Sequence, residues 1–201
     1  MRLLAARAAG AFGELALTCG VVLTFFAVYG LYGTDGEIEE QQARLSTVWA
    51  ATTAASASRG EAASREGAEP VSRMSIPRLK KSWVVVEGVS QKALRRGPGH
   101  YPETAHPGQE GNFAVAAHRI PAFFWDLDRL REGDPVVVQT RAATYVYRVT
   151  EQLVVTPESV DVLAAEPGER LLTLTTCHPR MANYQRLVVH AELAETVRKD
   201  V

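Results

Sequence analysis

Short runs of β-branched and aromatic residues, separated by turn residues, restrict the fold of this chain more than any other feature. The runs follow Met74 and comprise Val84–Val86, Phe113–Ala116, Val136–Val138, Tyr145–Val149, Leu153–Val155, Leu171–Thr175 and Leu187–Val189. Glycine, proline and aspartate separate most of them, as in Gly133-Asp134-Pro135. Closely spaced short strands with turn signals between them are typical of a β-barrel or a sandwich. We predict a mainly β domain over residues 73–197, folded as a closed barrel with short helices near 90–95 and 123–131.

An uncharged apolar run, Leu15 to Gly33, precedes that domain. As a helix, its roughly 19 residues would nearly cover the ~30 Å hydrocarbon core of a bilayer. Arg2 and Arg7 lie before the run, and the first basic residue after it is Arg44. The positive-inside rule then predicts a single-pass protein of the cell membrane. Its N-terminus over 1–14 would be cytoplasmic, 15–33 would be the transmembrane anchor, and the domain that follows would be extracellular.

A cleavable signal peptide and a buried core helix are the alternatives to an anchor. A signal peptide usually has an apolar core of about 7–15 residues that ends at a cleavage site made of small residues. Here the run is longer, and Tyr29, Leu31 and Tyr32 lie where cleavage would occur. A core helix would show a polar face, which this run lacks. We therefore favour an uncleaved anchor.

Residues 34–72, between the predicted anchor and the domain, are polar and rich in Ala, Ser, Glu and Gly. The segment Glu37-Ile38-Glu39-Glu40 could begin a short helix. The remainder has too few apolar residues to offset the entropy that is lost when a chain becomes ordered. We predict a flexible linker over 34–72.

The overall composition excludes some classes of function. The 201-residue chain has a formal net charge of −1, whereas nucleic-acid-binding proteins usually have a basic face or a high pI. Its five His and two Cys residues lack the paired spacings of a structural zinc site. We expect no nucleic-acid partner, no metal and no cofactor.

The two cysteines have different surroundings. Cys19 lies in the apolar run, and Cys177 is the only thiol in the rest of the chain. If the run is embedded in a membrane, the two cannot form a disulfide. A single thiol in an extracellular domain is either a reactive group or a small buried hydrophobe. A catalytic thiol needs a base, and it needs a donor for the oxyanion that forms when a carbonyl is attacked.

Five histidines could supply the base, namely His100, His106, His118, His178 and His190. His178 directly follows the cysteine, and neighbouring residues of a strand point to opposite faces. His100 and His106 lie among Gly and Pro, where an exposed loop histidine is expected. His190 lies in an apolar strand and could be a structural residue. His118 ends an apolar strand, and strand ends are where a rigid scaffold presents functional groups, so we favour His118.

Arg186 lies in the first strand predicted after Cys177, beside Leu187. A charge in a mostly apolar strand needs a partner or a function. The guanidinium could form a salt bridge with Glu192 or Glu195. It could instead donate to a tetrahedral oxyanion or hold the backbone of a substrate.

The run Thr173-Leu174-Thr175-Thr176-Cys177 resembles the TLxTC signature of sortases, and TLTTCHPRMANYQRLVVHAEL is similar to their cysteine-to-arginine strand pair. Upstream, GHYPETAHPGQEGNFAVAAHR is similar to the segment that carries the sortase histidine. The resemblance extends from Met74 to Leu193 and is greatest to the class E branch of high-GC Gram-positive bacteria. It implies a sortase-type closed barrel of about eight strands.

This resemblance implies roles for five residues. Cys177 would be the nucleophile, His118 the acid and base, and Arg186 the group that holds the oxyanion or positions the substrate. Thr175 and Tyr101 would contact the substrate. The implied activity is that of a cysteine transpeptidase, which cleaves an LAxTG- or LPxTG-like sorting motif between Thr and Gly through a thioacyl intermediate.

The implied partners are surface proteins with C-terminal sorting signals and an amine of lipid II or another peptidoglycan precursor. One alternative is a pilin-polymerising sortase that uses a Lys side chain as the acceptor. A second is a non-catalytic, membrane-tethered binding barrel that has kept the fold.

Overall fold

The computed structural model describes residue 14 and residues 16–28, 35–56 and 70–199. The chain forms two compact units, Met1–Glu37 and Ile38–Val201. In the first unit, residues 16–28 are helical. The predicted anchor over 15–33 lies partly outside the described residues, since 15 and 29–33 are not among them. Within the described parts of the chain, no helix combines the length and the apolar character needed to cross a membrane.

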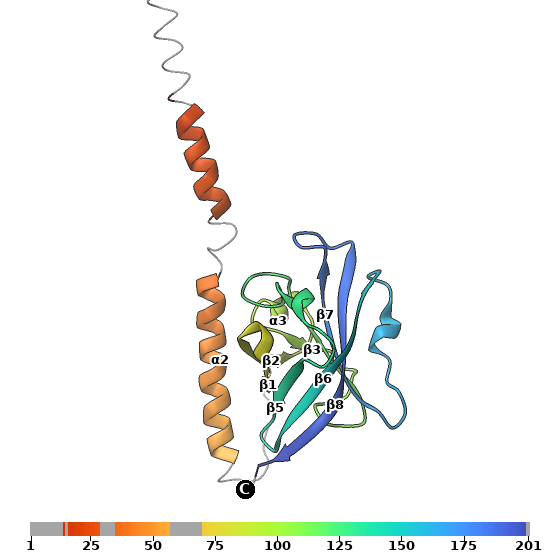
Figure 1. The fold of residues 1–201 in the computed structure, drawn as a ribbon. Coiled ribbons are helices and arrows are strands. Elements are labelled where there is room, and N and C mark those ends of the chain that lie inside the picture. The colour runs from red at the N-terminus through yellow and green to blue at the C-terminus, as the bar shows by residue number, and fades with distance from the viewer. Residues whose placement is uncertain (1–13, 15, 29–34, 57–69, 200–201) are drawn as a thin grey trace, which may run out of the picture. The chain divides into compact units, whose positions relative to one another are not determined.

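The second unit contains a closed barrel of eight strands, in the order β1-β2-β3-β4-β7-β8-β6-β5 (Figure 1). The strands are β1 (Pro70–Ile76), β2 (Lys81–Glu87), β3 (Gly99–His100), β4 (Gly111–Ala116), β5 (Pro135–Gln139), β6 (Ala143–Val155), β7 (Arg170–His178) and β8 (Gln185–Arg198). The predicted mainly β barrel is therefore confirmed. The two runs that we predicted within 145–155 form a single strand, β6.

The helices of this unit are short except for one. They are α2 (Asp35–Ser56), α3 (Gln91–Leu94) and 3₁₀ turns at Pro77–Leu79, Leu127–Arg129 and Val160–Leu163. Ser90 caps α3, because its hydroxyl accepts a hydrogen bond from the Ala93 N–H at 3.2 Å. The helix predicted near 123–131 is present only as the 3₁₀ turn Leu127–Arg129.

The predicted flexible linker over 34–72 is wrong for α2, and β1 begins at Pro70, before the predicted domain boundary at residue 73. The alanine-rich composition of this segment favours a helix. Tertiary contact adds to that preference, since Leu45 and Trp49 are buried in one cluster with residues of β2 and α3. Residues 57–69 of the predicted linker lie outside the described residues.

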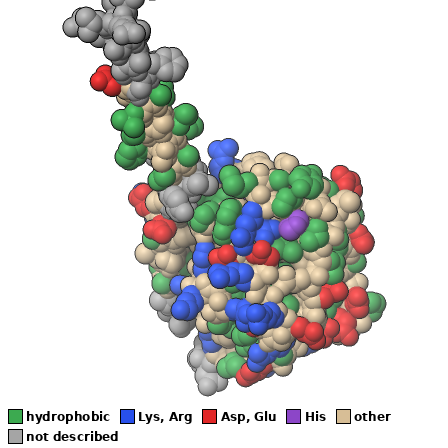
Figure 2. Space-filling model, turned by 45° about the horizontal axis from the view of Figure 1, so that its top comes forward, with side chains coloured by type: hydrophobic (Ala, Val, Ile, Leu, Met, Phe, Trp, Pro, Cys, Tyr) green, Lys and Arg blue, Asp and Glu red, His purple; other side chains and the backbone are tan. Residues whose placement is uncertain are grey.

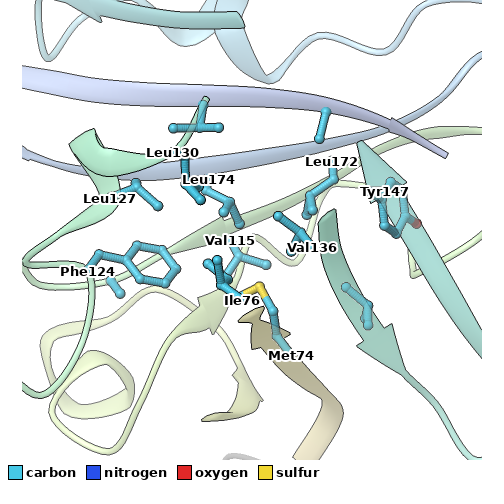
Figure 3. Packing of buried hydrophobic residues seen from close by; sticks show 14 of the residues in the cluster. Met74, Ile76, Val115, Phe124, Leu127, Leu130, Val136, Tyr147, Leu172 and Leu174 are labelled. Carbon is cyan, nitrogen blue, oxygen red and sulfur yellow. The ribbon is translucent and has the colours of Figure 1, made fainter. Parts of the chain in front are cut away.

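Alternate residues of every strand except β3 fill the barrel, as Figure 3 shows for several of them. The interior cluster includes Phe113, Val115 and Ala117 from the β4 segment, Leu172 and Leu174 from β7, and Leu187, Val189 and Ala191 from β8. Since successive side chains of a strand point to opposite faces, the residues between these lie on the outside of the barrel. By the same alternation, the side chains of Cys177, Arg186 and His118 lie on the outside of the barrel.

Candidate active site

Cys177 and Arg186 lie directly opposite each other on neighbouring antiparallel strands. The pairing of β7 with β8 places Thr175 opposite Val188 and Cys177 opposite Arg186. Opposed residues of an antiparallel pair have Cβ atoms about 4.5–5.5 Å apart and project on the same side of the sheet. The thiol is partly exposed, so the cysteine is not the fully buried small hydrophobe of our alternative prediction.

His118 reaches the same end of the barrel from β4, which lies parallel to β7. The last pair in register is Ala116 with Thr175. One residue further, the Ala117 N–H donates to the Thr175 carbonyl at 3.1 Å. His118 and Cys177 each lie two residues beyond that last pair, on the outer side of adjacent parallel strands. The fold therefore brings the cysteine, the histidine and the arginine of the sequence prediction to one place.

His118 is half-buried, and its backbone is fixed by a hydrogen bond from the Phe124 N–H to its carbonyl at 3.2 Å. Burial lowers the pKa of the His118 imidazole, and the charge of Arg95 lowers it further. The neutral imidazole is thereby favoured. A neutral imidazole can accept a proton from a thiol, as a general base must.

The guanidinium of Arg186 is held by backbone carbonyls rather than by a carboxylate. Its Nη1 donates to the carbonyl of Asn183 at 2.8 Å and to that of Gln185 at 2.9 Å. Among the described residues it forms no ion pair, so the alternative of a salt bridge with Glu192 or Glu195 is wrong. Its Nε and Nη2 groups make no hydrogen bond within the described parts of the chain, which leaves them for a substrate or an oxyanion.

Thr175 and Tyr101 contact each other next to this site. The Tyr101 hydroxyl and the Thr175 Oγ1 are 3.1 Å apart. Thr175 shares the outward side of β7 with Cys177. The backbone of Tyr101 is fixed as well, because the Tyr101 N–H donates to the Ala114 carbonyl at 3.0 Å. A substrate that lies along β7 towards the thiol would therefore pass these two side chains.

Two of the remaining histidines, His190 and His100, have structural partners. The side chain of His190 bonds Thr173 Oγ1 through Nδ1 at 3.0 Å, in agreement with a structural role. His100 is completely buried, with Nδ1 3.0 Å from a Glu87 carboxylate oxygen, so the prediction of an exposed loop histidine is wrong there. Residue 100 forms half of strand β3, which lies between β2 and β4. None of these contacts involves Cys177.

Sequence reasoning missed Arg119, which connects the loop that follows His118 with the strand β7 that carries Cys177. Its side chain is only 3% exposed and lies 3.0 Å from Asp128. Its Nη1 donates to the Cys177 carbonyl at 3.3 Å and contacts His178 Nδ1 at 2.8 Å. The signal was a charged residue directly after the strand-end histidine, before an apolar and aromatic loop.

Arg119 belongs to a set of ion pairs that we call the paired cluster: Arg119, Asp126, Asp128 and Arg180. Asp128 also accepts from Arg180 Nη2 at 2.9 Å, and Asp126 lies 3.4 Å from the same nitrogen. Arg180 stacks over the Trp125 ring, 5.1 Å from its centroid. On the face drawn in Figure 2, a His side chain reaches the surface close to neighbouring Lys or Arg and Asp or Glu side chains.

A family model described as "Sortase domain" matches residues 74–194. The chain therefore belongs to the sortase family, whose members are cysteine transpeptidases that act on surface proteins with sorting signals. The family resemblance predicted from the TLTTC run is confirmed by a match that includes all five predicted site residues.

The similar proteins include sortases named E, A and D. Sortase SrtE2 of Streptomyces coelicolor is 30% identical over 218 residues, which cover 98% of this chain and 86% of that protein. The structure of sortase E from Streptomyces avermitilis has 38% identity and a TM-score of 0.58, covering 64% of this chain and 90% of that one. Sortase E1 from Streptomyces coelicolor, solved with a tripeptide in the active site, has 34% identity and a TM-score of 0.60 over the same shares of the two chains.

Proposed function

We propose that this chain is a sortase E-like transpeptidase that cleaves a sorting motif of the LAxTG or LPxTG type between Thr and Gly, with Cys177 as its nucleophile. The observation that carries the proposal is the convergence of three strand ends. Cys177 faces Arg186 across β7 and β8, and His118 lies two residues beyond the end of β4, the parallel neighbour of β7. This is the arrangement that nucleophilic attack on a carbonyl requires.

In the proposed reaction, His118 accepts the thiol proton and the Cys177 sulfur attacks the threonine carbonyl carbon. A C–S bond forms, and the carbonyl oxygen takes up the negative charge that the free N–H groups of Arg186 stabilise. The C–N bond to glycine then breaks as His118 donates its proton to the departing nitrogen. An acceptor amine attacks the thioester, forms a new amide bond and returns the proton and the thiol.

The acceptor in this proposal is an amine of lipid II or another peptidoglycan precursor, and the donor is a surface protein with a C-terminal sorting signal. We also propose a single-pass anchor over 15–33, with the catalytic domain outside the cell. The uncharged run and the basic residues before it support this location. No carboxylate cluster, metal or cofactor is needed for any step.

The test uses the full-length protein purified in detergent with an LAxTG or LPxTG peptide and an added amine. Wild-type protein should release the glycine-containing fragment, form a thioacyl adduct on Cys177 and transfer the acyl part to the amine. Arg186→Ala should raise the barrier by about 3 kcal/mol, a loss of roughly 10²-fold in rate, because one oxyanion donor is removed. Mass spectrometry and product chromatography measure each step.

Cys177→Ala should be inert, and Cys19→Ala is its matched control because it removes the other thiol of the chain. Full activity of Cys177→Ala, or an adduct on Cys19, would sink the assignment. Equal rates for Arg186→Ala and wild type would remove the arginine from the proposed mechanism.

A further inference from the structure

A groove with four basic side chains lies between α2 and the α3 region. We call it the cationic groove. Its volume is ≈ 490 Å³, and it is lined by Gln41, Arg44, Leu45, Val48, Lys92, Arg95 and Arg96. One wall comes from a single face of α2, since residues 41, 44, 45 and 48 follow helical spacing. The other wall comes from α3 and the two residues after it. None of these residues takes part in the proposed reaction.

The two walls are held in place by specific contacts. The Gln42 side chain accepts a hydrogen bond from the Val84 N–H at 2.9 Å and donates to the Arg96 carbonyl at 2.6 Å. It reaches both because residue 97 is glycine, whose missing Cβ leaves the space that the Gln42 amide occupies. Trp49, on the next turns of α2, is 6% exposed in the cluster with Val84. The groove is therefore a fixed feature of this unit.

The cations of the groove have almost no protein counter-charge. Among the described residues, Lys92, Arg95 and Arg96 form no ion pair and their side chains donate no hydrogen bond. Arg44 pairs with Glu40 at 2.6 Å, but both side chains are mostly exposed, so that pair is weak and readily exchanged. Four positive charges around one concave space repel one another, and an anion in the groove would relieve this repulsion.

We propose that the cationic groove binds a diphosphate-bearing ligand. Three of its four cations are arginines, whose planar guanidinium groups match phosphate oxygens in a bidentate manner. A diphosphate has more negative charge than a single phosphate monoester and so matches four cations better. A groove suits a compact anion inside it, whereas attraction to a flat membrane surface needs no concavity. Leu45 and Val48 provide an apolar strip for the organic part of such a ligand.

Binding in the groove would change the protonation of His118 in the active site through one residue, Arg95. Arg95 lines the groove, and its charge also acts on the His118 imidazole. An anion bound beside Arg95 would offset that charge, so the imidazolium would become easier to form. The groove is thus placed to adjust the acid–base group of a neighbouring site. The binding itself does not depend on the proposed transpeptidase activity.

The experiment is calorimetric titration of the full-length protein in detergent with inorganic pyrophosphate, alongside nuclear magnetic resonance titration of the His118 ring. Wild-type protein should bind pyrophosphate more tightly than sulfate, and the His118 pKa should rise when pyrophosphate is bound. Arg44→Gln with Lys92→Gln removes one exposed cation from each wall and should weaken binding roughly tenfold or more. Arg170→Gln, at the opposite end of β7 from Cys177, is the matched control and should bind as wild type does.

Equal affinity in the double variant and in Arg170→Gln would overturn the proposal, and so would equal affinity for pyrophosphate and sulfate. Vesicles of phosphatidylglycerol, compared with phosphatidylcholine, distinguish a membrane surface from a diphosphate. If the groove cations affect only vesicle binding and pyrophosphate does not bind, the diphosphate assignment is wrong. Each readout is independent of turnover, so an inactive enzyme would still give a decisive result.

Discussion

Two groups of cationic side chains, the paired cluster and the cationic groove, differ in what neutralises their charge. In the paired cluster, Arg119 is 3.0 Å from Asp128, and Asp128 also pairs with Arg180 at 2.9 Å. In the cationic groove, Lys92, Arg95 and Arg96 have no carboxylate partner among the described residues. Arg119 is almost fully buried, whereas Lys92 and Arg95 are exposed. The paired cluster therefore stabilises the barrel, whereas the side chains of the cationic groove face solvent.

The histidine shows how much this difference matters. Arg119 is the next residue in the chain, yet the pKa of His118 is lowered first by burial and then by the charge of Arg95. A guanidinium next to a carboxylate presents a dipole, whose field falls off faster than that of an isolated charge. A cation paired with a carboxylate therefore stabilises the fold locally and has little electrostatic effect on more distant groups. A cation without one acts on its surroundings and remains available to a ligand.

The largest expected effect comes from breaking the paired cluster. Arg119→Met should lower the free energy of unfolding by about 2–3 kcal/mol, because it removes a buried ion pair and the donor to the Cys177 carbonyl. This is at the low end for a buried pair, since Asp128 is 38% exposed and can be rehydrated. Urea unfolding measures the change. Acylation of Cys177 should slow as well, because the end of β7 loses its hydrogen bond to the loop that follows His118.

Arg129→Met is the control for that variant. Its side chain is 70% exposed and lies 3.8 Å from Asp126, so its loss should change the unfolding free energy by no more than about 0.5 kcal/mol. If Arg119→Met and Arg129→Met destabilise equally, the paired cluster has no special structural role.

A smaller effect is expected from Arg95→Gln, which should raise the His118 pKa towards its ordinary value. Burial and Arg95 both lower that pKa in the folded state, so the unfolded chain binds more protons below a pH of about 6.5. Stability is then complete above that pH and falls on acidification. Arg95→Gln should reduce this fall. Histidine ring titration and urea unfolding at a series of pH values would measure both quantities.

An unchanged His118 titration in Arg95→Gln would show that burial alone sets the pKa. His190 is an internal reference in the same spectra, because burial lowers its pKa too, while Glu151 and Glu166 act on it in the opposite direction. Its titration should not respond to the loss of Arg95.

The smallest effect is expected when the groove loses Lys92, which has no ion pair among the described residues, and Arg44, whose pair with Glu40 is exposed. Arg44→Gln with Lys92→Gln should leave the unfolding free energy within about 0.5 kcal/mol of wild type. The same variant should bind pyrophosphate poorly, so affinity and stability would separate. A large loss of stability would mean that these cations support the fold, and the contrast between the two groups would fail.

Much of the barrel could be predicted from the chain because its strands are runs of β-branched residues with turns between them. Strand β3 could not, since Gly99 and His100 have no strand propensity of their own. They pair only because β2 and β4 lie on either side. Most of α2 was missed for a related reason, since the sequence indicated at most a short helix starting at Glu37. Its polar, alanine-rich sequence has little apolar character, and it is fixed by the burial of Leu45 and Trp49 and by the hydrogen bonds of Gln42.

Some residues of the candidate site could likewise be predicted from the sequence, and others could not. The strand pattern favoured His118, and the resemblance of the TLTTC run and its neighbouring segments to sortases pointed to Cys177 and Arg186. Arg119 and Arg95 were missed. Their importance depends on which charges lie next to them in space, and Asp128 reaches Arg119 through a loop whose path the sequence does not reveal. Pairings between side chains on remote loops leave no periodic pattern.

The position of β8 has a consequence for how the molecule matures. β8 pairs with both β6 and β7, so it closes the barrel, and it also holds Arg186 opposite Cys177. Pairings between distant segments form slowly, because the entropy of closing the loops is lost before the contacts are made. β7 and β8 follow each other in the sequence, whereas β4 and β7 are distant, so a partly folded chain would carry the thiol beside Arg186 but without His118. In the proposed reaction, the site would be complete only once the barrel has closed.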